Sequence, residues 1–439
     1  AVGRGSIQDI VSLLDRHAAI NSLGYNGTPL HYASWTGHHQ CIELLLDRHA
    51  NINAVDEDGN TPLHEASLNG HHQCIELLLD RHADIHAVDR DGSTPLHFAS
   101  LNGFHQCVEV LLDRHANIHA VDKCGFTPLH EALYYGRHQC VEVLLDRHAD
   151  IHAVDQYGRT HLHEALYHGH HQCVELLLDR HANINAVDQY GRTPLHRALS
   201  YGRHQCIELL LDRHANVNAA NQNGDKPLHL AADNGHHQCI ELLLDRHADI
   251  NAINHRDNTP LLLATFERRF QCIEVLLDRH ANVNAVNENG YGPLHAASLN
   301  GFHQCVELLL DRHANVNAVN ENGDKPLHLA ADNGHHQCIE LLLDRHADIN
   351  AINHRDNTPL LLATFERRFQ CIEVLLDRHA NVNAVNENGY GPLHAASLNG
   401  FHQCVELLLD RHANVNAVNE NGDKPLHLAA DNGHHQCIE

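Results

Sequence analysis

The sequence predicts a mainly α-helical solenoid, in which short helix-turn-helix repeats are stacked one on the next. Two observations predict it. Prolines recur every 33 residues from Pro29 to Pro425, and His161 occupies the one position of this series that lacks proline. Thirteen of the 14 cysteines keep the same step, from Cys41 to Cys437. A fixed period of roughly 20–50 residues is the signature of repeat architectures, whose units bury their apolar faces only by stacking.

The first element of each repeat is a short helix that begins at the proline. In the repeat at residues 60–92, Thr61 precedes Pro62, whose fixed φ and missing N–H suit the first turn of a helix. Thr61 is therefore predicted as the N-cap of a helix that runs to about Leu68, where an Asn-Gly pair ends it. The same order of residues predicts a helix start at each proline of the series.

The second element is a more apolar helix, predicted from about His71 to about Arg81. It carries Cys74, Ile75 and three consecutive leucines, which is more apolar surface than a one-sided helix needs. We expect it to be packed between neighbouring repeats. The turn-rich segment 88–92 then predicts a projecting hairpin-like loop before the next repeat.

The repeat resembles the ankyrin repeat at nearly every signature position. Residues 60–92 read NTPLHEASLNGHHQCIELLLDRHADIHAVDRDG, with a T-P-L-H start, a glycine-histidine link between the helices and an I-E-L-L-L run in the second helix. About 13 such repeats start between Thr28 and Lys424. The resemblance implies an ankyrin-repeat solenoid, with a partial repeat at 1–27 and tandem repeats at 28–439, the last of them truncated. Because the chain lacks methionine and stops inside a helix of the last repeat, we expect it to be part of a longer protein.

Two departures from the family pattern concern backbone conformation. Where ankyrin repeats usually carry glycine after the second helix, every repeat here carries histidine, from His17 to His412, which predicts exposed histidines in left-handed backbone. The repeats near Thr259 and Thr358 replace the signature histidine by leucine and the glycine between the helices by arginine. We expect these two repeats to be the weakest or locally distorted, and a contact role for their Phe-Glu-Arg-Arg segment is the alternative.

A third feature is an internal duplication. Residues 223–340 are identical to residues 322–439, which is a displacement of 99 residues, or three repeats. Any surface of one copy therefore recurs in the other, and two such surfaces could bind one partner bivalently. A recent duplication without functional consequence is the simpler interpretation.

Composition and patterning exclude several classes of function. With 30 Lys and Arg against 56 Asp and Glu, the formal net charge is −26, which argues against nucleic acid or an anionic membrane surface as partner. No run approaches the roughly 18 consecutive apolar residues of a membrane span, so we expect no membrane insertion. The periodic cysteines are predicted as buried, unpaired thiols, which indicates a reducing, cytoplasmic compartment, and only Cys124 is expected at an exposed loop tip.

No catalytic arrangement accompanies the many histidines. Signature histidines such as His64, His97 and His130 have no nucleophile at a matching spacing, and the ankyrin resemblance implies that they tie helix to loop through hydrogen bonds. Motifs for phosphate binding, metalloproteases and nucleophile elbows are missing from the sequence. We therefore expect no enzyme activity, no cofactor, no metal and no small-molecule substrate.

A binding site is predicted where the repeats differ from one another. Six of the ten tyrosines fall within 68 residues, interleaved with arginines, and Tyr and Arg are enriched in binding hot spots. The ankyrin resemblance implies that these variable positions line a concave groove. The predicted partner-binding residues are Tyr134, Tyr135, Arg137, Tyr157, Arg159, Tyr167, Tyr190, Arg192, Arg197, Tyr201 and Arg203. Sequence drift among repeats is the alternative explanation. Near the N-terminus, Trp35 and Tyr32 predict a smaller aromatic patch, which we expect to cap the core, with a contact role as the alternative.

These observations favour a protein–protein interaction scaffold that holds a partner protein or peptide in the groove. Since glutamates lie among the arginines, an acidic-aromatic or extended segment would fit. Two alternatives stay open. One is an elongated structural or mechanical spacer, such as a membrane-skeleton or channel tether, which the near-uniform repeats favour. The other is the targeting arm of a larger enzyme, such as a ubiquitin ligase or a pathogen effector.

Overall fold

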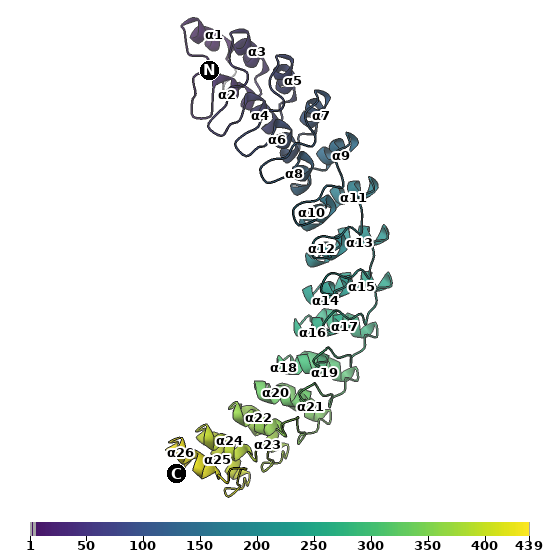
Figure 1. Cartoon of the computed structure of the whole chain (residues 1–439), viewed down its shortest axis with the longest axis vertical. Helices are drawn as coiled ribbons and strands as arrows, with labels where there is room; N and C mark the ends of the chain where they lie inside the picture. Colours follow the sequence, from purple (N-terminus) through teal and green to yellow (C-terminus); the bar gives the residue numbers. More distant parts are fainter. Residues whose placement is uncertain (1, 3–5, 439) are drawn as a thin grey trace. The chain divides into compact units, whose positions relative to one another are not determined.

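The computed structural model describes residues 2 and 6–438 of the chain. Residues 1, 3–5 and 439, which belong to the expected partial first repeat and truncated last repeat, lie outside the described residues. The chain divides into two compact parts, Ala1–Asn216 and Val217–Glu439, here called the N-terminal half and the C-terminal half. Each half consists of helix pairs joined by loops (Figure 1).

The N-terminal half contains one leading helix and six helix pairs among its described residues. The leading helix is α1 (Ile7–Asp15). The first helices of the pairs are α2 (Pro29–Thr36), α4 (Pro62–Leu68), α6 (Pro95–Asn102), α8 (Pro128–Tyr134), α10 (His161–His168) and α12 (Pro194–Ser200). The second helices are α3 (His39–Asp47), α5 (His72–Asp80), α7 (His105–Asp113), α9 (His138–Asp146), α11 (His171–Asp179) and α13 (His204–Asp212).

The C-terminal half repeats the arrangement over its own described residues. Its first helices are α14 (Pro227–Asn234), α16 (Pro260–Phe266), α18 (Pro293–Leu299), α20 (Pro326–Asn333), α22 (Pro359–Phe365), α24 (Pro392–Leu398) and α26 (Pro425–Asp431). Its second helices are α15 (His237–Asp245), α17 (Phe270–Asp278), α19 (His303–Asp311), α21 (His336–Asp344), α23 (Phe369–Asp377) and α25 (His402–Asp410), followed by the 3-10 turn η2 (His435–Cys437). Among the described helices, none combines the length and apolar character needed to cross a membrane.

Within each half the helices form two rows. First helices pack on first helices, as α2 does on α4 and α4 on α6, and second helices pack on second helices, as α3 does on α5 (Figure 1). The predicted first helix at 62–68 is confirmed by α4, while α5 starts one residue later and ends one residue earlier than predicted. The stacking of repeats therefore supplies the burial that a single helix pair lacks.

The core runs through the stack as a repeated set of small and branched side chains. In the repeat of α4 and α5, Leu63, Ala66, Cys74, Ile75 and Leu78 are each at most 1% exposed. Twelve of the periodic cysteines are buried and unpaired, as predicted, and Cys437 is only half-buried. Burial also raises the pKa of these thiols, in Cys107 to about 12, so that they stay protonated.

The signature histidine closes the helix start and joins it to the next repeat. The Nδ1 atom of His64 accepts a hydrogen bond from the backbone N–H of Thr61 at 3.1 Å. The Thr61 hydroxyl accepts in turn from the backbone N–H of His64 at 3.5 Å, so this pair forms a capping box with histidine in the usual place of glutamate. On the other side of the ring, Nε2 donates to the carbonyl of Ser93 at 3.1 Å, in the loop of the following repeat. The hydrogen bonds expected from the ankyrin resemblance are thus present, and they select the Nε2–H tautomer.

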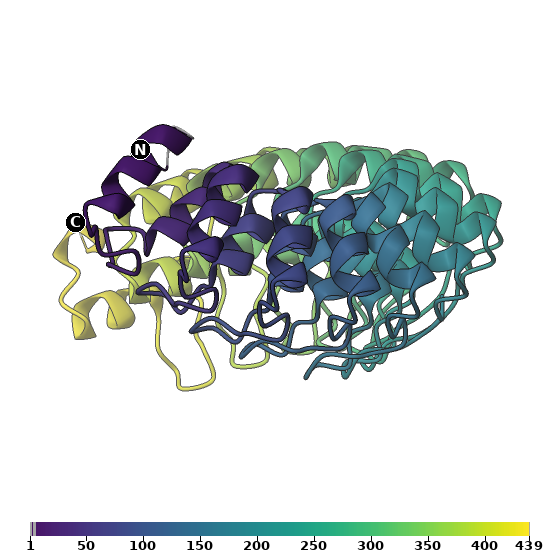
Figure 2. The same ribbon diagram turned by 90° about the horizontal axis from the view of Figure 1, so that it is seen from above.

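The loops between repeats are turns without regular strands among the described residues. In the loop at 56–60, the backbone N–H of Asp56 donates to the carbonyl of Asn60 at 3.0 Å, and Asp56 Oδ1 accepts from the N–H groups of Asp58 and Asn60. Neighbouring loops are joined directly, since the N–H of Arg90 donates to Asp58 O at 2.9 Å. The expected hairpin-like loops are therefore closed turns, which extend from one side of the helices (Figure 2).

The histidine after each second helix adopts the left-handed conformation expected for it. Thirteen such residues, from His17 to His412, have φ between 62° and 68°.

The two divergent repeats have left-handed backbone at a second position, between their two helices. Arg268 and Arg367 occupy this position with φ of 55° and 53°, where other repeats have glycine. The loops before these repeats also place Asp257 and Asp356 in this region, at 55° and 54°, whereas the helices α16 and α22 keep their length.

Replacing His82 by glycine is expected to stabilise the protein by up to about 1 kcal/mol, because glycine occupies this region without a Cβ clash. His82 is exposed, with a φ of 67°, so the change removes little packing. Urea unfolding of the full chain measures the effect, and His82→Ala, which keeps a Cβ, should show no gain. A destabilised His82→Gly protein would contradict the strain argument.

Candidate functional site

Five rings lie in series along the C-terminal ends of α8, α10 and α12, and we call them the tyrosine ladder. The ladder consists of Tyr134, Tyr135, Tyr167, His168 and Tyr201. Ring centroids are 4.9 Å apart for Tyr134 and Tyr135, and 4.4 Å apart for Tyr134 and His168. The series continues from His168 to Tyr167 at 4.7 Å and from Tyr167 to Tyr201 at 4.8 Å. Stacking of repeats therefore joins residues 34 positions apart into one aromatic surface.

The ladder combines exposure with internal support. Tyr134, Tyr135 and Tyr201 are 42%, 46% and 42% exposed, which is high for large aromatic side chains. Nε2 of His168, at the middle of the series, donates a hydrogen bond to Oε1 of Glu164 at 3.2 Å. Rigid aromatic side chains lose little conformational entropy on binding, which is why they dominate interface hot spots.

Arg197 lies beneath this surface and differs from the other predicted arginines. Its guanidinium stands over the ring of Tyr167 at 4.6 Å and over that of Tyr201 at 5.2 Å, and the residue is only 9% exposed. Its buried Nε atom has no hydrogen-bond partner among the described residues. Cation–π contacts offset part of the desolvation of this charge, but a guanidinium usually also pairs with an anion when it is buried.

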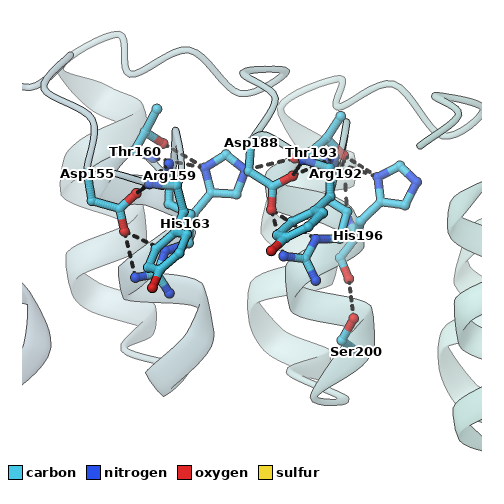
Figure 3. Close-up of polar contacts among 11 residues, drawn as sticks. Asp155, Arg159, Thr160, His163, Asp188, Arg192, Thr193, His196 and Ser200 are labelled. Atoms are coloured by element: carbon cyan, nitrogen blue, oxygen red, sulfur yellow. Dashed lines mark hydrogen bonds and ion pairs between the residues drawn. The ribbon is translucent and has the colours of Figure 1, made fainter. Parts of the chain in front are cut away.

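Two further predicted arginines, Arg159 and Arg192, lie on loops at the other end of the first helices (Figure 3). Arg159 stands 5.2 Å from the ring of Tyr157 and donates from Nε to Asp155 at 2.6 Å. In the next loop, Arg192 stands 4.7 Å from the ring of Tyr190 and forms the equivalent ion pair with a buried aspartate. These arginines therefore already have an anionic partner within their own loop.

The carboxylates of these loops are held charged by their arginines. Burial raises the pKa of Asp155, but hydrogen bonds from the backbone and side chain of Arg159 outweigh it and lower the pKa overall. Thr160 and Thr193, which cap α10 and α12, follow directly on the two loops and fix them against the helices (Figure 3). The Tyr-Arg-Asp groups are thus rigid parts of the loops.

Arg137 and Arg203 occupy a position that joins neighbouring repeats. Nε of Arg137 donates to the carbonyl of Leu101 at 3.0 Å, and Nη2 of Arg203 donates to the carbonyl of Tyr167 at 2.9 Å. His170, at the same repeat position, makes the same link to the carbonyl of Tyr134 at 3.0 Å. Both arginines therefore connect the end of a first helix to the following repeat. An alignment of the repeats, which places these arginines at the position of His170, could have indicated this role.

Two features of the site escaped sequence reasoning. His168 links Tyr134 of α8 to Tyr167 of α10, although it was not among the predicted residues. Its alignment with Tyr135 and Tyr201, at the same position of their repeats, was the available signal. The different surroundings of the five arginines were not visible in the sequence at all.

The groups of the site are suited to bind the side chains of another molecule. Aromatic faces, a buried guanidinium and paired loop arginines can stack on apolar or aromatic side chains and can accept an anion. Across the residues that the structure describes, no three His, Cys, Asp or Glu side chains are grouped so that they could hold a metal ion.

Comparison with known families agrees with the architecture. The family described as ankyrin repeats (3 copies) matches residues 1–89, 81–155, 138–221, 213–287, 279–353 and 360–439. A search of curated proteins finds no match for the chain. Ankyrin repeats are in general protein–protein interaction modules. Because the family matches cover nearly the whole chain and the helix pairs recur as the family requires, this protein belongs to the ankyrin-repeat family.

Proposed function

We propose that this chain is a protein-interaction scaffold that binds a segment of a partner protein on the tyrosine ladder. The observation that carries the proposal is the buried Arg197 guanidinium, which has aromatic neighbours but no anionic partner within the described residues. A carboxylate from a bound partner would supply the missing anion, and the planar guanidinium is suited to bind one with two parallel hydrogen bonds.

The surroundings of Arg197 favour an acidic residue next to an aromatic or apolar one in the partner. Tyr167 and Tyr201 hold the guanidinium plane in place, so little side-chain entropy remains to be lost on binding. The exposed faces of Tyr134 and Tyr135 lie further along the same ladder and can receive an apolar side chain. Arg137, Arg159, Arg192 and Arg203 contribute mainly by fixing this framework, because each already donates to a group of the chain.

The test is quantitative affinity capture from a cytosolic lysate with the full chain and a variant in which Tyr134, Tyr167 and Tyr201 are changed to alanine. Truncation of hot-spot residues typically costs about 2 kcal/mol each, so recovery of the specific partner should fall at least about tenfold. Arg197→Gln should give the same direction of change, and Arg197→Lys should restore part of the binding because it keeps the charge.

A matched control is Leu299→Ala combined with Leu398→Ala. These leucines occupy the repeat position of Tyr134 and Tyr167 in the C-terminal half, so they test general loss of surface area at this position. Circular dichroism verifies that every variant folds. Equal recovery by the tyrosine variant and the unmodified chain would refute the ladder as the site, and no specific capture by either would favour the structural spacer.

A further inference from the structure

A cavity of about 410 Å³ lies near the N-terminus, three repeats away from the tyrosine ladder. Tyr25, Tyr32 and Trp35 form one part of its lining, and the loop at 56–60 together with Glu65 of α4 forms another. We call it the N-terminal pocket. Tyr32 and Trp35 lie three residues apart on α2 and so share a face of the helix.

The aromatic side of this pocket is open to solvent. Tyr25 is 94% exposed and Trp35 is 47% exposed. Trp35, predicted as a cap of the core, thus leaves nearly half of its surface open to solvent. The Tyr32 hydroxyl accepts a hydrogen bond from the backbone N–H of Asn26 at 3.2 Å, which holds the preceding turn beside the ring.

The opposite side of the pocket is acidic and has no counter-charge of its own. Asp56, Glu57, Asp58 and Glu65 line it, and none of them forms an ion pair with a described lysine or arginine. Asp56 uses its oxygens to hold its own loop. Burial, with a contribution from the charge of Asp56, raises the pKa of Glu65 to about 7, as expected for a carboxyl group that lacks a cation.

The side chain of Asn60 belongs to the same pocket lining. Its Oδ1 atom is buried and has no hydrogen-bond partner among the described residues. This acceptor has no donor, and the carboxylates beside it have no counter-charge. Both features favour a ligand group that donates hydrogen bonds and carries positive charge. The aromatic faces attract a cation as well, and they bury the aliphatic stem that carries it.

We propose that the N-terminal pocket binds a lysine or arginine side chain of a partner polypeptide. The aliphatic stem lies against Trp35 and Tyr25, and the charged head donates hydrogen bonds toward Glu65 and Asn60. A polypeptide is the expected source because ankyrin repeats in general bind proteins. This site is separate from the tyrosine ladder and does not depend on its function.

Trp35 makes the test direct, because it is the only tryptophan of the chain and its emission reports on the pocket itself. The full chain is titrated with a neutral glycine-serine peptide that carries one central lysine, and with versions carrying arginine, glutamine or glutamate. The lysine and arginine peptides should change the emission in a saturable way, and the glutamine and glutamate peptides should not. Spermidine is titrated in parallel as a free amine.

Two variants locate the effect. Glu65→Gln should raise the half-saturating peptide concentration about tenfold, which is the effect of losing one charged hydrogen-bond partner. Asp58→Asn, on the exposed loop, should raise it in the same direction, and it leaves the helix pair untouched. Glu131→Gln is the matched control, because Glu131 has the same repeat position as Glu65 and a pKa likewise raised by burial, so it removes an equal charge elsewhere.

The proposal would be overturned by an emission change that fails to saturate, by an equal response to the glutamine peptide, or by equal effects of Glu65→Gln and Glu131→Gln. The last result would indicate general attraction to an acidic protein. Saturation by spermidine at lower concentration than by the lysine peptide would overturn the assignment to a polypeptide. The tyrosine-ladder variant should bind the lysine peptide normally, which separates this test from that of the proposed function.

Discussion

Acidification from about pH 7.5 to about pH 5 is expected to lower the melting temperature by roughly 10 °C, because the repeated signature histidines are held neutral in the folded protein. Burial lowers the pKa of nine of them below the ordinary value of 6.5. They are His31, His64, His97, His130, His163, His229, His295, His328 and His394. The effect on stability is large because the same small free-energy penalty, that of protonating a buried histidine, recurs in many repeats.

The hydrogen bonds explain why the charged form is excluded. Nδ1 of His97 accepts from the backbone N–H of Thr94 at 3.1 Å, and Nε2 donates to the carbonyl of Phe126 at 3.0 Å. A second proton on Nδ1 would point at the threonine N–H, and two donors would face each other. Protonation therefore breaks the helix cap as well as charging a buried ring.

The sign of the pH dependence follows from these lowered values. The unfolded chain binds protons at about pH 6.5, where the folded histidines do not, so stability is complete above that pH and is lost as pH falls through the folded pKa values. Glu65 acts in the opposite direction, since its pKa is raised to about 7 and its protonated form is favoured in the folded state. The histidines outnumber such acids, which makes acid destabilising overall.

Thermal unfolding followed by circular dichroism measures the total effect, and amide exchange locates it. The amide of Thr61, which donates to His64, should lose protection as the pH falls. The amide of Thr259 is the internal control, because Leu262 replaces the signature histidine in that repeat. Equal pH dependence of protection at both threonines would contradict the histidine explanation.

His161→Pro is expected to stabilise the protein by about 2 kcal/mol, because it removes two buried polar atoms that make no well-formed hydrogen bond. His161 is 1% exposed, and neither Nδ1 nor Nε2 makes a well-formed hydrogen bond among the described residues, although the backbone of Ile151 lies near the ring. Burial, with the neighbouring His130 as a smaller cause, lowers its pKa to about 3. Proline also suits this place as the first residue of α10.

His161 disturbs the preceding repeat as well. Its ring lies 4.2 Å from that of His130. His64 and His97 donate from Nε2 to a carbonyl 29 residues later, but within the described residues His130 forms no such bond. The smaller proline ring should leave His130 free to donate to the carbonyl of Arg159, which occupies the corresponding position.

Urea unfolding of the two proteins measures the gain, and His161→Ala provides the comparison that removes the ring without adding proline. We expect alanine to give part of the stabilisation and proline to give more. The bond between His130 and Arg159 can be followed by the ring nitrogen shifts of His130 in NMR. A lower urea midpoint for both variants would show that the ring of His161 stabilises its repeat.

Much of the fold could be read from the sequence because its causes are local and repeated. Within a single repeat, the start of α4 is set by its first residue, proline, and by the threonine before that proline. Its end is set by the glycine that follows the C-cap. The buried thiols and the left-handed histidines follow from the same periodicity. The cavity beside Trp35 was not foreseen, since it depends on how whole repeats pack.

The sequence by itself determined the repeat length, the order of the two helices, the cap residues and the region where tyrosine and arginine gather. Tertiary structure alone decided what each arginine does. Arg137 and Arg203 donate to carbonyls 36 residues earlier in the chain, Arg159 has an aspartate four residues away, and Arg197 rests between tyrosines of two repeats. The physical reason is that the partner of a guanidinium often comes from a neighbouring repeat. Some arginines find a carbonyl or carboxylate there or in their own loop, and Arg197 does not. Sequence spacing alone does not specify which arginine is paired.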